Sequence, residues 1–402
     1  MTDQTPDFRS PDFLLGHIKH TLSFYDGRCL DPSGGFFHFF KDDGTVYDKR
    51  TRHLVSSTRF VFNHAMAARR FKKLEYLQRV RHGLHFLQTA HAQKQGGYAW
   101  QIDWHNGMSV VQDGTNHCYG LAFVLLAHAH ALMADVPEAS RGLEATFQLM
   151  EQRFWEPAHG LYADEATPDW QVGPYRGQNA NMHSCEAMIA AYDATRDRKY
   201  LQRALTLAES ITGRQAALAD GLIWEHYKPD WSVDWDYNKD DRTNIFRPWG
   251  YQTGHLTEWA KLLMQLEAHL PEGERPTWLV ERATRFFDTA MRHGWDETHG
   301  GLVYGFAPGG EVCDADKYFW VQAESFAAAA LLALRTGDAK YWQWYERIWA
   351  YSWAHMVDHE HGAWYRIRTP DNRAYSDEKS PAGKTDYHTM GACYDVLRGL
   401  GA

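Results

Sequence analysis

The segment HGGLVYGF at residues 299–306 has the pattern that decides the fold: a glycine followed by a short run of apolar and aromatic residues. Five other segments share this pattern: GGFFHFF at Gly34, GGYAW at Gly96, HGLYADE at Gly160, DGLIWEHY at Gly221 and HGAWYRI at Gly362. The intervals between successive glycines, with Gly300 as the fifth, are 62, 64, 61, 79 and 62 residues. An interval that recurs near 62 residues indicates an internal repeat.

Each interval has room for two helices of about 15–20 residues and their loops. Helical hydrophobic patterns occur at residues 79–91, 121–133, 141–154, 200–214 and 326–335. Six copies of helix, short strand and helix predict an (α/α)6 barrel, an all-α fold with short β-hairpin-like segments, as one domain over residues 1–402. The alternative is a chance recurrence of glycine–aromatic turns. The longest interval contains a polar loop at residues 230–247, whose length is typical of a functional loop or a lid.

Charge and cysteine content narrow the classes of partner and compartment. The formal net charge is −9 and no long basic run exists, so nucleic acid and anionic membranes are not expected partners. The five cysteines are isolated, which favours neither a zinc ribbon nor a disulfide framework and suits a reducing compartment. The N-terminus lacks a signal-peptide pattern, and the longest apolar run, LAFVLLAHAHALM, is too short to span a bilayer. We therefore expect a cytoplasmic protein.

The stretch NANMHSCEA, residues 179–187, carries polar side chains where a helix needs a face to bury. In a helix, Asn179, His183 and Glu186 lie at i, i+4 and i+7, on one stripe. In a closed ring the inner helices have no ordinary solvent side, and their first turns converge on a central pocket. We therefore expect this stripe to face a pocket, with Glu186 supporting from behind.

Four other segments place polar residues at the start of an apolar helix. These are SSTRFVFNHAMAA with Arg59, RPWGYQTGHLTEWAKLL with His255 and Glu258, YFWVQAESFAAAALLAL with Trp320 and Glu324, and GKTDYHTMGACYDVL with His388. Each residue has a structural alternative: a histidine hydrogen-bonded in the core, an arginine paired with a carboxylate, a glutamate facing a helix dipole, or a packed tryptophan. Their recurrence at one position of the repeat favours a common site.

Two chemistries suit this set of residues. The H-x-x-E pairs at His183 and His255 could hold two metal ions, as carboxylate–histidine pairs do in other helical proteins. Histidines without a metal suit proton transfer, because imidazole titrates near neutral pH. An arginine and neutral donors would stabilise an enediolate oxygen. No phosphate-binding glycine loop and no G-x-S-x-G motif is present to indicate another chemistry.

The segments STRFVFN, NANMHSCEA, RPWGYQTGHLTEWAKL and GKTDYH, with the Trp320–Glu324 segment, resemble the N-acylglucosamine 2-epimerase superfamily over nearly the whole chain. Within it they are most similar to the branch of D-mannose and sulfoquinovose isomerases. The family fold is the (α/α)6 barrel, and its members need no metal and no redox cofactor. By this resemblance His388 and His255 are the catalytic histidines. The resemblance assigns sugar binding to Arg59, Asn179, His183, Glu258, Trp320 and Glu324.

The resemblance implies an aldose–ketose isomerase that interconverts D-mannose and D-fructose, with D-lyxose and D-xylulose as a second pair. His255 would assist ring opening, and Glu258, one turn away, would orient it. His388 would move the C2 proton to C1 through a cis-enediolate, with Arg59 and His183 stabilising its charge. Delivery to the opposite face of C2 would instead give a mannose–glucose 2-epimerase.

Two departures bear on the substrate. Cellobiose epimerases have a tryptophan five residues before the last catalytic histidine, where this chain has Gly383, so we expect a monosaccharide. A sulfosugar would need a further cationic contact, for which Arg242 and Arg247 are available, although loop salt bridges explain them as well. Two other hypotheses are a glycoside hydrolase using Glu225 and Asp164, and a non-enzymatic sugar-binding protein. We expect a monomer or a homodimer.

Overall fold

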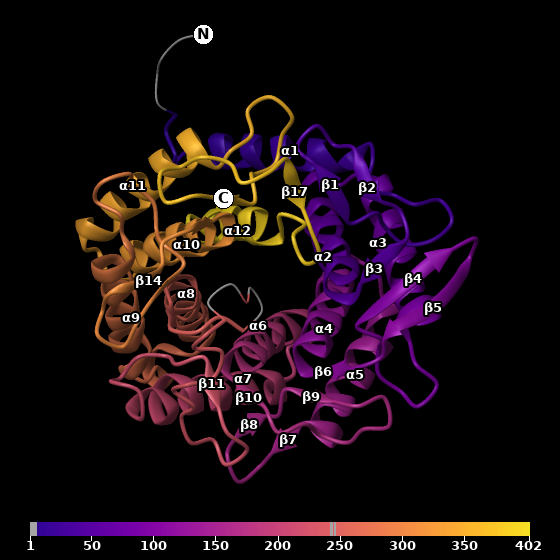
Figure 1. The fold of residues 1–402 in the computed structure, drawn as a ribbon, viewed down its shortest axis with the longest axis horizontal. Coiled ribbons are helices and arrows are strands. Elements are labelled where there is room, and N and C mark those ends of the chain that lie inside the picture. The colour runs from indigo at the N-terminus through magenta and orange to yellow at the C-terminus, as the bar shows by residue number, and fades with distance from the viewer. Residues whose placement is uncertain (1–5, 242–243, 245–246) are drawn as a thin grey trace.

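The computed structural model describes residues 6–241, 244 and 247–402, and its helices form two concentric rings (Figure 1). The inner helices are α2 (Leu54–Phe71), α4 (Cys118–Met133), α6 (Gln178–Thr195), α8 (Thr253–His269), α10 (Phe319–Thr336) and α12 (Tyr387–Gly399). The outer helices are α1 (Pro11–Asp26), α3 (Leu74–Phe86), α5 (Ala139–Arg153), α7 (Arg198–Glu209), α9 (Trp278–Gly294) and α11 (Ala339–His355). Each inner helix contacts the next inner helix and one outer helix, and α12 contacts α2, which closes the ring. The predicted (α/α)6 barrel is confirmed.

Burial explains why the helices divide into two rings. Outer helix α7 buries Tyr200, Ala204, Leu207 and Ala208, a single stripe with helical spacing. Inner helix α4 buries residues on every side, because neighbouring helices surround it. The helices predicted at 79–91 and 200–214 are each continued by a π-helical turn, Leu87–His91 and Ser210–Gln215. The predicted helical segments are therefore present, although most begin earlier than the pattern indicated.

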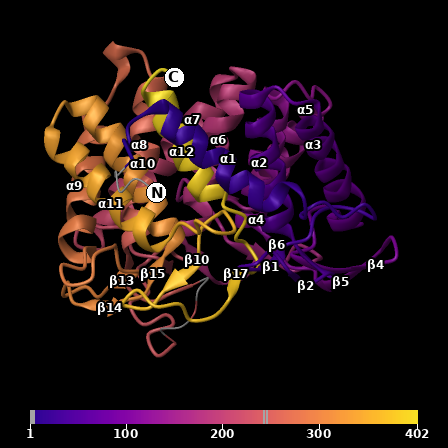
Figure 2. The same cartoon turned by 90° about the horizontal axis from the view of Figure 1, so that it is seen from above.

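Short strands connect the repeats at one end of the ring (Figure 2). They are β1 (Phe39–Lys41), β2 (Val46–Asp48), β3 (Thr51–His53), β4 (Gln101–His105), β5 (Met108–Asp113), β6 (Asn116–His117), β7 (Trp155–Glu156), β8 (Leu161–Tyr162), β9 (Glu165–Ala166), β10 (Arg176–Gly177), β11 (His226–Tyr227), β12 (Tyr251–Gln252), β13 (Gly305–Phe306), β14 (Val312–Asp314), β15 (Lys317–Tyr318), β16 (Ile367–Arg368) and β17 (Glu378–Ser380). All pairs are antiparallel, and β17 pairs with β1 in the register Phe40↔Ser380, which joins the two ends of the described chain. We call this end of the ring the stranded end.

The six glycines that define the repeat all have positive φ, between 62° and 151°. Gly362 illustrates why no other residue fits: at φ 93° an added Cβ would lie 2.9 Å from the backbone oxygen of His20. The glycine repeat in the sequence therefore marks a backbone turn that recurs in each copy. Five of the six inner helices begin directly after a strand, so their first turns lie at the stranded end.

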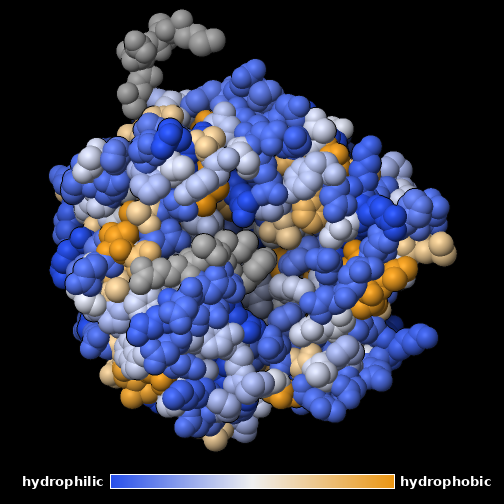
Figure 3. Space-filling model, viewed as in Figure 1, coloured by the Kyte–Doolittle hydropathy of each residue, from blue (hydrophilic) through white to orange (hydrophobic). Residues whose placement is uncertain are grey.

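The surface at the face drawn in Figure 3 is mostly hydrophilic, with apolar residues in scattered groups. Among the described residues, no helix has the length and apolar character needed to cross a membrane.

Candidate active site

A pocket of about 130 Å³ opens among the first turns of the inner helices. It is lined by His53, Val55, Arg59, Tyr119, Asn179, His183, Pro248, His255, Glu258, Tyr304, Tyr318, Phe319, Trp320, Arg366, Pro381, Ala382, Gly383, Lys384 and His388. Seven of the eight predicted site residues line it. The eighth, Glu324, is fully buried behind the pocket and contacts His388. The prediction that the polar starts of the inner helices converge is confirmed.

His388 and Glu324 form a buried pair. Nδ1 of His388 lies 2.7 Å from Oε1 of Glu324, so a neutral His388 donates from Nδ1 and leaves Nε2 unprotonated. Burial lowers the pKa of His388 well below 6.5, and the nearby charges of Arg59 and Lys261 lower it further. The neutral form, which can accept a proton, is therefore the stable one at neutral pH.

His255 is held by a carboxylate that precedes it by 30 residues in the sequence. Its Nδ1 lies 2.9 Å from Oε1 of Glu225, and Gln178 donates to the same carboxylate over 2.9 Å. Trp259 in turn donates to the Gln178 oxygen at 2.7 Å, which fixes the amide. The prediction that Glu258 orients His255 is wrong, because Glu225 occupies the Nδ1 side of the ring.

The indole ring of Trp320 lies between the two histidines. Its centroid is 5.1 Å from that of His255 and 5.8 Å from that of His388. Both imidazoles and this indole line the pocket, so they would contact the same small molecule. Trp320 therefore forms the pocket wall between the two histidines in addition to packing.

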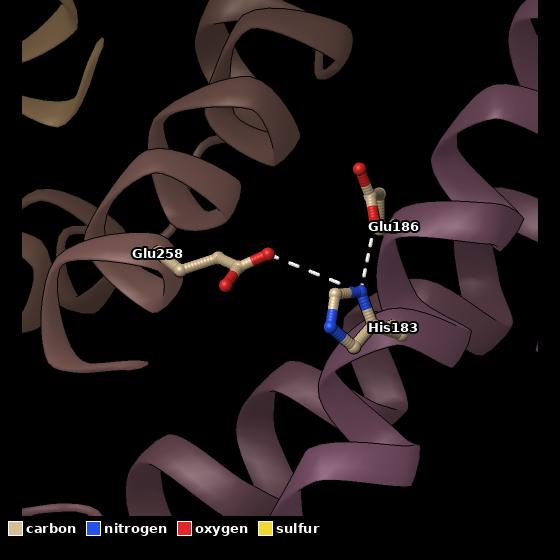
Figure 4. A group of neighbouring side chains, drawn as sticks. All are labelled: His183, Glu186 and Glu258. Atoms are coloured by element: carbon tan, nitrogen blue, oxygen red, sulfur yellow. Dashed lines mark hydrogen bonds and ion pairs between the residues drawn. The ribbon is translucent and has the colours of Figure 1, made fainter. Parts of the chain in front are cut away.

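Glu258 has two unsatisfied oxygens and points across the pocket. Figure 4 shows it reaching from α8 toward the ring of His183 on α6, with Oε1 3.9 Å from Nδ1. Within the described part of the chain, neither carboxyl oxygen has a hydrogen-bond partner. Burial raises the pKa of Glu258 well above 4.5, and the neighbouring Glu324 raises it further. The raised pKa favours the neutral carboxylic acid, which can donate one hydrogen bond and accept others from a polar ligand.

His183 is braced by Glu186, as the helical spacing predicted. Its Nδ1 lies 3.0 Å from Oε2 of Glu186, and the hydroxyl of Tyr387 donates to Oε1 (Figure 4 shows the first contact). Burial acts to raise the pKa of Glu186, but the hydrogen bond from His183 is the main cause that lowers it to about 2. Burial lowers the pKa of His183. Both pKa shifts are consistent with a neutral His183 that donates a hydrogen bond to an ionised Glu186.

Arg59 has no carboxylate partner among the described residues. One guanidinium nitrogen donates to the carbonyl of Gly383 at 2.5 Å, and another donates to the hydroxyl of Tyr119 at 3.2 Å. The guanidinium also lies over the ring of Phe123, 4.4 Å from its centroid. The alternative that Arg59 forms an ion pair is wrong, so its positive charge is available to an oxyanion in the pocket.

Two clusters of acids and histidines have the spacing of metal ligands: His183, Glu186 and Glu258, and Glu258, Glu324 and His388. In each cluster another group already occupies one of the two acids, Glu186 in the first and Glu324 in the second. Tyr387 donates to Glu186, and the ammonium of Lys261 lies 2.5 Å from Glu324. A divalent ion between Glu324 and His388 would face that ammonium. We therefore assign these acids to hydrogen bonding and ion pairing.

The structure describes only one of the two arginines that could bind a sulfosugar. Arg247 forms an ion pair with Glu165 at 2.5 Å and stacks over Tyr175, 3.8 Å from its centroid. The loop salt-bridge interpretation is therefore the correct one for Arg247. Arg242 lies outside the described residues, as does part of the loop predicted to be a lid.

The sequence pattern does not reveal the roles of two residues at the site, Glu225 and Lys261. The sequence suggests Glu225 only as a hydrolase acid, although it directly follows the apolar run of the fourth glycine segment. Lys261 was not considered, because a lysine among leucines on a helix gives no signal of its partners. Glu225 contacts His255 directly, whereas Lys261 contacts Glu324, the partner of His388.

The comparisons with known proteins agree with this geometry. A family model described as N-acylglucosamine 2-epimerase matches residues 35–392. A D-mannose isomerase of Marinomonas mediterranea is 54% identical over 397 residues, 98% of this chain and 99% of that protein. A crystal structure of a D-mannose isomerase has a TM-score of 0.95 at 54% identity and covers 98% of this chain and all of that one. A cellobiose 2-epimerase structure from Spirochaeta thermophila, 23% identical, has a TM-score of 0.86, covers 100% of this chain and 99% of its own, and shares the fold.

Proposed function

The chain belongs to the N-acylglucosamine 2-epimerase family, and from this premise we propose that it is an aldose–ketose isomerase that interconverts D-mannose and D-fructose. D-lyxose and D-xylulose, which lack only the terminal CH₂OH group of that pair, form a second substrate pair. The observation that carries the proposal is the His388–Glu324 pair. Glu324 holds Nδ1 of His388, so Nε2 is free, and His388 lines the small pocket. The named relatives support mannose as the aldose.

The proposed reaction moves one proton between adjacent carbons. His255 assists opening of the sugar ring. Nε2 of His388 then takes the proton from C2 of the open-chain aldose. The electrons of the C2–H bond form the C1–C2 double bond, and the π electrons of the C1 carbonyl move to O1, which gives a cis-enediolate. Arg59 and His183 stabilise the negative charge on its oxygens. His388 returns the proton to C1, while the carboxylate of Glu324 stabilises the transient imidazolium.

The hydroxyl proton must also move, from O2 of the aldose to O1 of the ketose. Glu258 suits this step, because its neutral carboxyl group has a donor and an acceptor oxygen without partners among the described residues. It would donate its proton to O1 and accept the proton of O2, and so end in the state in which it began. This role replaces the predicted orientation of His255.

The alternatives within the family receive less support. A 2-epimerase would use the second histidine on the opposite face of C2, and His255 is oriented for such a role by Glu225. The names of the relatives favour isomerisation. Gly383 lines the pocket where a cellobiose epimerase has tryptophan, which favours a monosaccharide. A sulfoquinovose isomerase would lack the contact suggested for Arg247, which is paired with Glu165.

The hydrolase hypothesis fits the geometry poorly. Glu225 binds His255 and Gln178, and Asp164 accepts a hydrogen bond from the backbone of Gly177. Neither carboxylate is among the pocket-lining residues, whereas a glycosidase needs two carboxyl groups flanking the scissile bond. A non-enzymatic sugar-binding protein would have no need of two histidines with oriented Nδ1 atoms.

Location and assembly remain part of the proposal. All five cysteines are free, which supports a reducing cytoplasm. We keep the expectation of a monomer or a homodimer.

The proposed function is tested by the order of products. The purified protein is incubated separately with D-mannose, D-glucose, D-lyxose and sulfoquinovose in D₂O, with and without EDTA, and followed by NMR. We expect fructose as the first product from mannose and unchanged turnover with EDTA. Glucose as the first product would assign an epimerase, and loss of turnover with EDTA would contradict the metal-free assignment. Sugar binding without exchange of the C2 proton would indicate a binding protein.

The acidic side of the pH profile follows from the pKa of His388. Only neutral His388 can accept the C2 proton, and its pKa lies well below 6.5. The fraction of active base is therefore retained as the pH falls through 6.5 and is lost only at lower pH. We expect an apparent acidic pKa in kcat/KM for mannose below about 6.5. A profile that loses activity at or above that value, with the fold intact by circular dichroism, would contradict the assignment.

A further inference from the structure

Lys261 is a buried lysine that the proposed reaction does not use. It lies on α8, one turn after Glu258, and is only 4% exposed. Its ammonium lies 2.5 Å from Oε2 of Glu324 and 3.6 Å from Oδ2 of Asp395. It is not among the residues that line the substrate pocket. Lys261 therefore does not contact the substrate, and its direct contact with the catalytic pair is through Glu324.

Glu324 bridges Lys261 and His388. One of its oxygens faces Nδ1 of His388 at 2.7 Å, and the other faces the Lys261 ammonium. We propose that Lys261 is a positioning residue, whose fixed positive charge keeps Glu324 ionised and thereby keeps Nε2 of His388 free to accept the substrate proton. This inference rests on the proposed function, because it assumes that His388 is the base.

The charges around this pair come from four inner helices. Helix α2 contributes Arg59, α6 contributes His183 and Glu186, α8 contributes Glu258 and Lys261, and α12 contributes Tyr387 and Asp395. Glu258 is neutral and His183 is neutral, as their pKa directions indicate. The remaining fixed positive charges are those of Arg59 and Lys261. Of these two cations, Lys261 is the one paired directly with Glu324.

Lys261 keeps its charge despite its burial. Burial acts to lower its pKa, but the surrounding carboxylates, first Glu324 and then Asp395, raise it above 10.5. Burial raises the pKa of Glu324, and the charge of Lys261 opposes that rise. The ion pair is thus mutually dependent: each member is charged because the other is present.

Removing the ammonium should disable the base by either of two routes. A buried Glu324–His388 pair with no cation beside it has a net negative charge and takes up a proton more readily. If the proton resides on His388, the imidazolium cannot accept another. If it resides on Glu324, the carboxylic acid donates to Nδ1, and the single imidazole proton moves to Nε2, which faces away from Glu324. Both states leave no lone pair for the substrate.

A second cavity gives access to this ion pair from the other side. It encloses about 940 Å³, and its lining includes Lys261, Glu324, Asp395 and the C-terminal Ala402. His388 lines both cavities, so it separates the substrate pocket from this rear cavity. A small amine in solution could therefore reach the position of the Lys261 ammonium without passing through the substrate pocket.

The test compares Lys261→Met and Lys261→Arg by the pH dependence of kcat/KM for mannose. For Lys261→Met we expect the acidic limb to move to higher pH by about 1–3 units, the size of shift that a nearby opposite charge produces. Lys261→Arg retains the charge and should keep the limb within about half a unit of the wild-type value. A limb in Lys261→Met that coincides with that of the wild type would overturn the inference.

The matched control is Lys317→Met, which removes another fully buried lysine, paired with Asp296 at 2.8 Å outside both cavities. It should keep the wild-type acidic limb. A shift equal to that of Lys261→Met would mean that loss of any buried lysine has this effect, and would overturn the inference. If the wild type itself fails to exchange the C2 proton of mannose, the proposed function fails before the lysine variants are considered.

Amine rescue provides a second measurement if Lys261→Met folds poorly. In Lys261→Ala, ethylammonium added at millimolar concentration should restore kcat/KM at least fivefold and move the acidic limb back toward that of the wild type. Ethanol, which is similar in size and uncharged, should restore nothing. Equal effects of ethylammonium and ethanol, or no effect of either in a folded variant, would contradict a role for the charge.

Discussion

Replacing His388 with asparagine should lower kcat/KM for mannose by about 10²–10⁴-fold, the usual contribution of a general base. Asparagine keeps a polar side chain of similar length but cannot accept a proton from carbon. Exchange of the C2 proton with D₂O should fall by the same factor. Substrate binding should change much less, because the other pocket residues remain in place.

His128→Asn is the matched control for this variant. His128 is also fully buried on an inner helix, but it does not line the pocket. It should keep kcat/KM within about threefold of the wild type, whatever its effect on Tm. If His388→Asn retained more than a tenth of wild-type activity, His388 would not be the base.

Replacing Glu324 with glutamine should have an effect of similar size, up to about 10⁴-fold in kcat, as for an amide that replaces the carboxylate behind a catalytic histidine. The glutamine NH₂ group can donate to Nδ1 of His388, which lies 2.7 Å from the native carboxylate. The imidazole would then carry its proton on Nε2 and could not act as a base. Steady-state kinetics should show the loss in kcat, with little change in KM.

Two variants limit the interpretation of Glu324→Gln. Glu324→Asp retains the charge and should recover part of the activity. Glu267→Gln changes another buried glutamate, which pairs with Arg335 at 2.7 Å away from the substrate pocket, and should leave kcat unchanged. If Glu324→Gln and Glu267→Gln lost activity equally, the effect would reflect general destabilisation.

The fold could be predicted because one glycine marks each copy of the repeat in the sequence. Each copy needs a left-handed turn, and glycine adopts that conformation with the least strain. The site was predictable in part for a related reason. Polar residues such as Asn179 and His183 at the start of a buried helix have no place in an apolar core, so they indicate a pocket.

The pairing of the site residues was not predictable in the same way. His255 and Glu258 lie one turn apart, and this proximity in sequence suggested a contact. Glu225, which binds His255, precedes it by 30 residues and lies outside the helix that carries His255. Lys261 and Glu324 meet only because α8 and α10 are neighbours in the ring. Contacts between segments that are far apart in the sequence depend on how the ring folds. The spacing of residues within one helix does not predict them.

The arrangement also explains how a buried cluster of acids is tolerated. Glu186 is stabilised as a carboxylate by His183 and Tyr387, and Glu324 by Lys261. Glu258 has no such partner among the described residues, and its raised pKa favours the neutral form. Three glutamates that meet near one pocket thus have three different environments, and their chemical roles differ accordingly.

The transfer of label from D-[2-²H]mannose in H₂O tests the central claim most directly. One base that serves both carbons should give D-fructose as the first product, with the deuterium divided between C1 of fructose and the solvent. Early time points analysed by NMR and mass spectrometry would measure this division. Glucose as the first product, or mannose that keeps its label in the presence of active protein, would contradict the account.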